Sequence, residues 1–273
     1  MQRIPDDIID QVTAVARPAG HCLRGDDRAG GIAFDFALGV VHEWITAETT
    51  HSNRTQWLAP HGVLLALAWH MLRADDAAHG AAHGSATHSR VIVWIGRRVW
   101  PSPRAMIAVD GSRALLARSI FVDPSADRSR SALANHMWAV QQSLACDEVM
   151  TVIWDASGCD LTATRRMQLA AAREKERPPV LALAVRPWCE RTTLTCAATR
   201  WSVTPHVCEC TSDTAPDRSP HWRAELLRAR GALGSQVGSQ VGGQIGRQVG
   251  GRVGGHVGEC SFVVGATWSW SGG

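Results

Sequence analysis

The sequence of 273 residues contains no tyrosine and only one lysine, Lys175, so nearly all of its positive charge is carried by arginine. The usual phosphate-binding loop, G-x-x-x-x-G-K-[ST], needs a lysine to neutralise phosphate charge and glycines whose backbone amides wrap around it. Lys175 lies in the stretch AAAREKERPP, which has no glycine. The sequence therefore excludes a standard phosphate-binding loop.

Long apolar runs and closely paired cysteines are also missing. No run approaches the roughly 20 apolar residues of a membrane-spanning helix. The first ten residues, MQRIPDDIID, carry acids where a signal peptide would have a basic start and an apolar stretch. The eight cysteines form no C-x-x-C pair, which is typical of free thiols in a reducing compartment. We expect a cytoplasmic protein that makes no membrane contact.

Two groups of side chains contain residue types that bind metals. They are His79, His83 and His88 in one stretch, and His206, Cys208 and Cys210 in another. Neither group has the spacing of a zinc knuckle, and the C-x-C pair lacks a second pair at zinc-binding distance. We expect no metal and no cofactor, with a structural zinc beside Cys208 as the weaker alternative.

The charge is unevenly distributed along the chain. The formal net charge is +3, yet the first 60 residues hold eight acidic residues and only five arginines. The basic surplus therefore lies downstream. It permits weak contact with nucleic acid or an acidic partner, but it is no dense basic stripe of the kind that dedicated DNA-binding proteins carry.

Four short, nearly continuous apolar runs predict buried strands. They are 91–95 (VIVWI), 119–122 (SIFV), 148–154 (EVMTVIW) and 180–186 (VLALAVR). After Thr199 three more strand-like segments follow: ATRWSV, HWRAELLRAR and CSFVVGATWSW. Because no helix between these three is long enough for a crossover, they predict antiparallel strands that extend the sheet.

Helical patterns separate the first strands. An apolar helix is predicted over 58–72 and another over 161–175, with Asp160 as its N-cap. Over 127–145, with Asp127 near the start, one apolar stripe is formed by Leu133, Met137, Val140 and Leu144. Strands that alternate with helices predict an α/β fold with a parallel sheet.

The chain is predicted to comprise an N-terminal segment, 1–30, and one domain, 31–273. Small polar residues predict a flexible loop at 75–90. Over 231–258 glycine recurs every fourth residue, from Gly234 to Gly258. We interpret this Gly-rich repeat as a flexible insertion, since each glycine in a helix costs about 1 kcal/mol relative to alanine. A Gly-zipper helix is the alternative.

Five short motifs in order resemble a known family. They are HEW, WIGRRVWPSPRA, LLARSIFVDP, ATRRMQLAA and AATRW, spread over roughly residues 30–230. They are similar to the ImuA family, RecA-like proteins encoded beside a mutagenic translesion polymerase cassette. The resemblance implies a RecA-like, mostly parallel twisted sheet flanked by helices and extended by antiparallel C-terminal strands.

The same resemblance places the phosphate-binding loop at 45–55, where the sequence has neither glycine nor lysine. The water-activating glutamate corresponds to Gly96, and the metal-binding acid at a strand end corresponds to Asp155. The loop is therefore degenerate, and we predict that the protein is not an enzyme. Arg54, Thr55 and Asp155 are weak remnant candidates for nucleotide binding, and a capping role is the alternative for Asp155.

Arginine-rich segments are the candidate interaction surface. The residues are Arg97, Arg98, Trp100 and Arg104 beyond one strand, and Arg165, Arg166 and Arg173 on a helix. The first group follows the end of a strand, where α/β proteins usually bind ligands. The alternative for both groups is solvated arginines on an ordinary surface.

The resemblance implies a non-catalytic accessory protein of DNA damage tolerance, an adaptor in an error-prone translesion polymerase complex of the SOS response. It also implies the partners: a Y-family-like polymerase protein, an error-prone replicative-type polymerase and RecA itself. Direct contact with DNA is left open. The alternatives are a divergent RecA-like NTPase and an SOS-type cell-division inhibitor that keeps a RecA-like shape.

Overall fold

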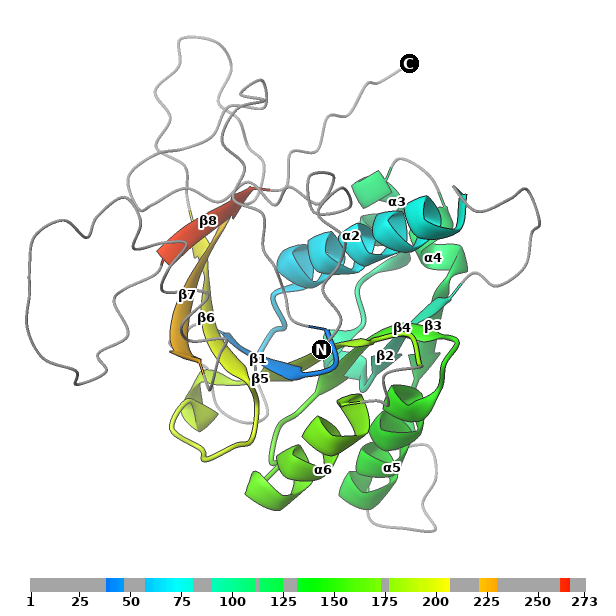
Figure 1. Ribbon diagram of the computed structural model, residues 1–273. Coiled ribbons are helices and arrows are strands. Elements are labelled where there is room, and N and C mark those ends of the chain that lie inside the picture. Colours follow the sequence, from blue (N-terminus) through cyan, green and yellow to red (C-terminus); the bar gives the residue numbers. More distant parts are fainter. Residues whose placement is uncertain are drawn as a thin grey trace, which may run out of the picture.

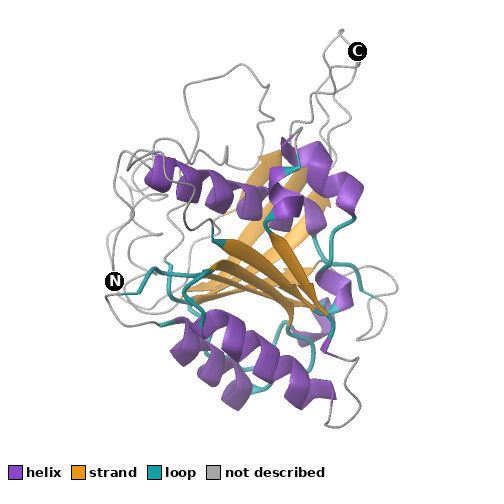
Figure 2. Ribbon diagram, turned by 90° about the vertical axis from the view of Figure 1, so that its right-hand side faces the viewer, coloured by secondary structure: helices purple, strands orange, loops and turns teal. Residues whose placement is uncertain are grey.

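A single twisted sheet forms the centre of the molecule (Figures 1 and 2). The computed structural model describes residues 38–46, 57–80, 90–110, 113–124, 132–172, 177–206, 221–229 and 261–265. Within these residues the strands are β1 (Val41–Thr46), β2 (Val91–Ile95), β3 (Ser119–Val122), β4 (Val149–Asp155), β5 (Leu181–Arg186), β6 (Thr199–His206), β7 (His221–Ala229) and β8 (Ser261–Gly265). They form one sheet in the order β3-β2-β4-β5-β1-β6-β7-β8.

The sheet is mostly parallel. From β3 across to β6 every neighbouring pair is parallel, whereas β7 pairs antiparallel with both β6 and β8. The prediction of an α/β fold with a parallel sheet that continues into antiparallel C-terminal strands is confirmed.

Helices cover both faces of the parallel part. On one face lie α2 (His61–Gly80), α3 (Pro103–Asp110) and α4 (Ala114–Ala117), and on the opposite face lie α5 (Ala132–Ala145) and α6 (Leu161–Ala171) (Figure 1). Two short 3-10 turns, η1 (Arg97–Val99) and η3 (Trp188–Glu190), follow β2 and β5. A strand between two helical layers is buried on both sides, which explains why the predicted strands were continuous apolar runs.

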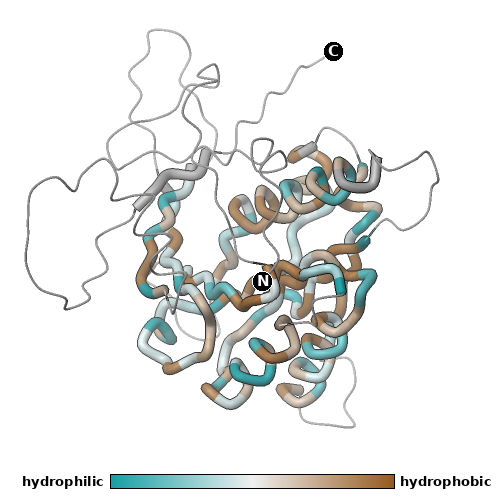
Figure 3. Tube along the Cα trace, in the orientation of Figure 1, coloured by the Kyte–Doolittle hydropathy of each residue, from teal (hydrophilic) through white to brown (hydrophobic). Residues whose placement is uncertain are grey.

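β1 occupies the middle of the sheet, between β5 and β6. Alternate side chains of a strand point to opposite faces, so Trp44 joins the core beneath α2 and Val41 joins the core beneath α5 and α6. All six residues of β1 are buried. Figure 3 shows the brown, apolar segments concentrated along the central strands and the inner sides of the helices.

The C-terminal end of α2 and the buried face of α5 differ from the predictions. α2 continues through Gly80, so residues 75–80 of the predicted 75–90 loop are helical, and Asp75 is buried. It is held there by ion pairs with Arg90 and Arg118. Leu133 of the predicted apolar stripe is 49% exposed, because it lies at the first turn of α5, ahead of the buried Val140 and Leu144.

The start of α6 agrees with the prediction. Asp160 is the N-cap, and its carboxylate accepts a hydrogen bond from the backbone N–H of Ala163 at 2.7 Å. Such a cap contributes about 1 kcal/mol because it satisfies an otherwise unpaired amide of the first turn. The helix ends at Ala171, earlier than the predicted 175.

Several predictions fall outside the described residues. These are the N-terminal segment 1–30, the Gly-rich repeat 231–258, and the residues Arg54, Thr55, Arg173, Cys208 and Cys210. Among the helices that the structure describes, none combines the length and apolar character needed to cross a membrane.

Candidate functional site

The carboxyl ends of β2, β3 and β4 meet at one edge of the sheet. After β2 the chain continues to α3 on one face, whereas after β4 it continues to α6 on the opposite face (Figure 1). The point where neighbouring connections leave in opposite directions is where open α/β sheets usually bind ligands. We call the residues that follow these strands, together with those packed on them, the strand-end site.

Asp155 is the central acid of the strand-end site, and both of its carboxylate oxygens are engaged. Oδ2 accepts a hydrogen bond from Arg98 Nη1 at 2.9 Å. Oδ1 accepts from the Ser157 backbone N–H at 2.9 Å and from Ser157 Oγ at 2.5 Å. A metal ion that used Asp155 as a ligand would compete with the Arg98 guanidinium, which already neutralises the carboxylate.

Arg98 is itself held from a second side. Its guanidinium carbon lies 6.0 Å from the centroid of the Trp57 ring, within the range of a cation–π contact. Its backbone also shares a hydrogen bond with His61, at the start of α2. Burial lowers the pKa of His61, and this hydrogen bond only partly offsets the effect. The Arg98 guanidinium is thus held between the Trp57 ring and the Asp155 carboxylate.

A side chain at Gly96, after the end of β2, would be strained and tightly packed. Its φ of +90° is a conformation that favours glycine. A Cβ atom there would lie 3.0 Å from Cε1 of His136 and 3.1 Å from Cβ of Asp155. Burial lowers the pKa of His136, while the nearby Asp155 raises it by a smaller amount. A glutamate at position 96 would therefore be strained by its backbone conformation and would crowd His136 and Asp155.

The first group of predicted surface arginines is largely paired. Arg97 Nε donates to Asp123 at the end of β3 at 2.6 Å, and Arg98 is paired with Asp155. Trp100 packs against the core: its indole N–H donates to the Trp94 carbonyl at 3.1 Å, and its ring meets Phe121 edge-on. Trp100 is therefore a half-buried packing residue.

The other predicted arginines lie elsewhere. Arg104 is exposed on α3, and Arg165 and Arg166 are exposed on α6. Because α3 and α6 cover opposite faces of the sheet (Figure 1), Arg104 and the α6 arginines do not form one surface.

A buried ionic network was not predicted from the sequence. Glu43 in β1 accepts a hydrogen bond from Arg186 Nε in β5 at 3.0 Å and another from Arg200 Nε in β6 at 2.9 Å. The Thr195 hydroxyl donates to the same carboxylate at 2.8 Å. The Glu43 and Arg186 side chains are fully buried and that of Arg200 nearly so.

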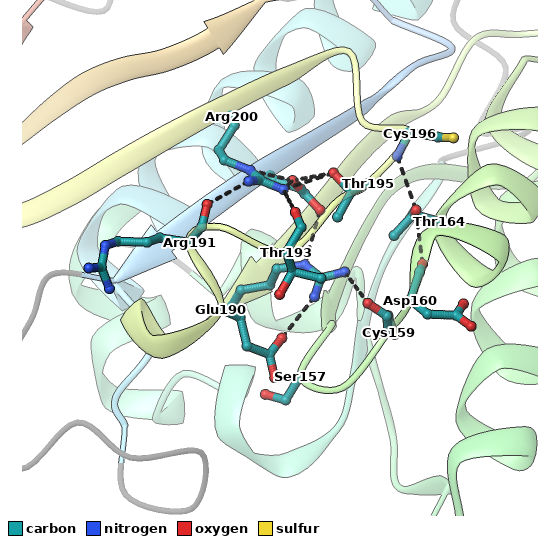
Figure 4. Close-up of polar contacts among 12 residues, drawn as sticks. Ser157, Cys159, Asp160, Thr164, Glu190, Arg191, Thr193, Thr195, Cys196 and Arg200 are labelled. Atoms are coloured by element: carbon teal, nitrogen blue, oxygen red, sulfur yellow. Dashed lines mark hydrogen bonds and ion pairs between the residues drawn. The ribbon is translucent and has the colours of Figure 1, made fainter.

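The network also fixes the loop that follows Asp155. Arg186 donates to Glu190 at 2.8 Å and to the carbonyl of Cys159 at 2.9 Å. Glu190 in turn accepts from the backbone N–H of Gly158 at 2.9 Å. Figure 4 shows Cys159, Glu190 and Arg200 converging from the segment after β4, the segment after β5 and β6. The ionic network therefore holds the turn in which Ser157 contacts Asp155.

One sequence signal for the network was present. Glu43 lies within the buried strand VHEWIT, and Arg186 is the last residue of the buried strand LALAVR. Charged residues are almost never fully buried unless they are paired. Arg186 lies in a predicted core strand and therefore points to a buried acidic partner. The strand that holds this partner, β1, was not predicted, and the strand order that joins the two residues is not visible in the sequence.

The described residues contain no group of three or more His, Cys, Asp or Glu side chains placed to hold a metal ion. Cys159, beside the network, is buried, and burial raises the pKa of its thiol to about 11. That keeps the thiol protonated and unreactive.

No protein-family model matches the chain, and no curated protein matches its sequence.

Proposed function

We propose that this chain is a non-catalytic accessory protein with a RecA-like core, an adaptor in an error-prone translesion polymerase complex of the SOS response. The observation that carries the proposal is the state of Asp155, which is neutralised by Arg98 and bonded to Ser157. In an ATPase of this kind the acid at that strand end must reach a metal ion. Here the contacts of Asp155 favour a structural role.

Two further features support the proposal. The family-like motifs fall on elements that build the sheet and its cover: HEW lies in β1, ATRRMQLAA in α6, and TRW begins β6. Gly96, at the position of the water-activating glutamate, cannot carry a side chain without strain. A RecA-like scaffold that lacks these catalytic groups fits a protein that acts through its surface.

Nucleotide binding separates this proposal from a divergent NTPase. When the full chain is titrated calorimetrically with ATP at millimolar Mg²⁺, we expect no saturable binding. We expect the same for Arg98→Ala, because freeing Asp155 restores neither the glycines nor the lysine that hold phosphates. Saturable ATP binding by the unaltered chain that is lost in Asp155→Ala would contradict the proposal and favour an NTPase.

The adaptor role is tested in the host cell. Deleting the gene should lower the frequency of ultraviolet-induced mutations towards the spontaneous level, because error-prone bypass needs its polymerase complex. Overproducing the chain should leave cell length unchanged. An unaltered induced mutation frequency in the deletion strain, or filamentation on overproduction, contradicts the adaptor role, and filamentation favours a cell-division inhibitor.

A further inference from the structure

The outer side of α5 and α6 carries large apolar side chains that the fold does not use. Trp138 on α5 is 59% exposed, and Leu169 on α6 is 67% exposed. Both helices already bury a separate inner face against the sheet, through residues such as Val140 and Met167. Exposed apolar side chains that gather on one side of a protein mark interaction surfaces.

The exposed residues of α6 form an ordered stripe. Leu161, Arg165 and Leu169 are spaced at i, i+4 and i+8, so they lie along one line of about 12 Å on the helix surface. All three are exposed. We call this line the α6 stripe. It presents a positive charge between two apolar residues.

Within α5 and α6 themselves the charge has one sign, and the exposed Asp160 immediately precedes α6. Arg165 and Arg166 are both exposed, and neither the α5 sequence, ALANHMWAVQQSLA, nor the α6 sequence, LTATRRMQLAA, contains an acidic residue. α5 and α6 pack side by side on the outside of the sheet (Figures 1 and 2). Two adjacent helices present ridges and grooves that can receive a third helix.

We propose that α5 and α6 bind an acidic amphipathic helix of a partner protein. Its apolar residues would cover Leu161 and Leu169, while an Asp or Glu one turn from each would pair with Arg165. A second copy of this chain fits poorly, because two-fold pairing would oppose like-charged arginines. Nucleic acid would pair with the arginines but leave the leucines uncovered. The inference does not depend on the proposed translesion role.

The test uses a displayed library of amphipathic helical peptides, about 18 residues or roughly five turns long, with the positions of one face randomised. The full chain is the immobilised target. We expect selected peptides to carry Asp or Glu flanked by apolar residues at a spacing of four. Their affinity should fall about tenfold for Leu169→Ala and for Arg165→Glu, because both residues belong to the α6 stripe that the peptide covers.

The decisive measurement reverses the charge of both the peptide acid and Arg165. Peptides in which the selected acid is replaced by lysine should bind Arg165→Glu better than the unaltered chain. Two matched controls use exposed residues elsewhere: Leu194→Ala and Arg104→Glu should leave the affinity unchanged, since neither lies on α5 or α6. Circular dichroism establishes that each variant is folded.

Several outcomes would overturn the proposal. They are the recovery of no binding peptide, the selection of basic or uncharged peptides, and equal losses in the control variants. If the chain forms concentration-dependent dimers and Leu169→Ala abolishes them, the outer side of α5 and α6 is a self-association surface instead. Binding to phosphatidylserine vesicles or to duplex DNA that Arg165→Glu abolishes, without peptide binding, would assign it to those ligands.

Discussion

Replacing Glu43 by glutamine should lower the free energy of unfolding by about 3–5 kcal/mol. The change removes the carboxylate that balances the buried Arg200 guanidinium and one of the two carboxylates that contact Arg186. The Arg186 side chain is 0% exposed and that of Arg200 is 6% exposed, so neither can recover hydration without a local rearrangement. Urea denaturation followed by far-ultraviolet circular dichroism measures the effect.

The matched control for this prediction is an ion pair at the surface. Arg97, whose side chain is 76% exposed, pairs with Asp123. Exposed pairs contribute at most about 1 kcal/mol, because water already solvates both partners. Arg97→Ala should therefore change stability much less than Glu43→Gln. Equal losses in the two variants would show that the buried network adds no more stability than a surface pair.

The second large effect is expected for Trp44→Ala in the central strand, at about 3–5 kcal/mol, the range for removing a buried aromatic side chain. Trp44 is 1% exposed and stacks on Trp201 with the ring centroids 5.9 Å apart. Truncation leaves a cavity between the sheet and α2 that its rigid surroundings cannot close. The shift of the urea midpoint at constant slope is the measurement.

Trp138→Ala is the control for the central tryptophan, since this side chain is 59% exposed on α5. Surface substitutions away from packed features usually change stability by less than about 0.5 kcal/mol. A loss from Trp138→Ala as large as that from Trp44→Ala would contradict the assignment of Trp44 to the core and of Trp138 to the surface.

Local patterns predicted the elements well where one physical signal dominated. The run VIVWI is β2 and LALAVR is β5, because strands buried on both faces are mostly apolar. The run SIFV is β3, although this edge strand is only partly buried. Asp160 caps α6 as predicted, since capping depends only on residues within one turn. The loop predicted at 75–90 started too early because Asp75 and Asp76 look solvated in the sequence, whereas both are paired with Arg118.

The sequence pointed to Asp155 and Arg98 as candidate site residues, but it did not show that they contact each other. Asp155 was identified as the acid at a strand end, and Arg98 as part of an arginine-rich surface. Their ion pair joins residues 57 positions apart in the chain. Only the parallel pairing of β2 with β4 brings the two strand ends together. The role of Gly96 likewise depends on His136 from α5.

Local sequence patterns were enough to predict most of the strands and the three longest helices, the change from parallel to antiparallel strands, and the lack of a standard phosphate-binding loop. These features follow from periodicity, capping and residue type, which act over a few neighbouring residues. Local patterns did not predict β1, α3 or α4. The tertiary structure alone decided that β1 lies between β5 and β6 and that Glu43 therefore meets Arg186 and Arg200. Contacts between residues more than 140 positions apart depend on strand order, which no local pattern specifies.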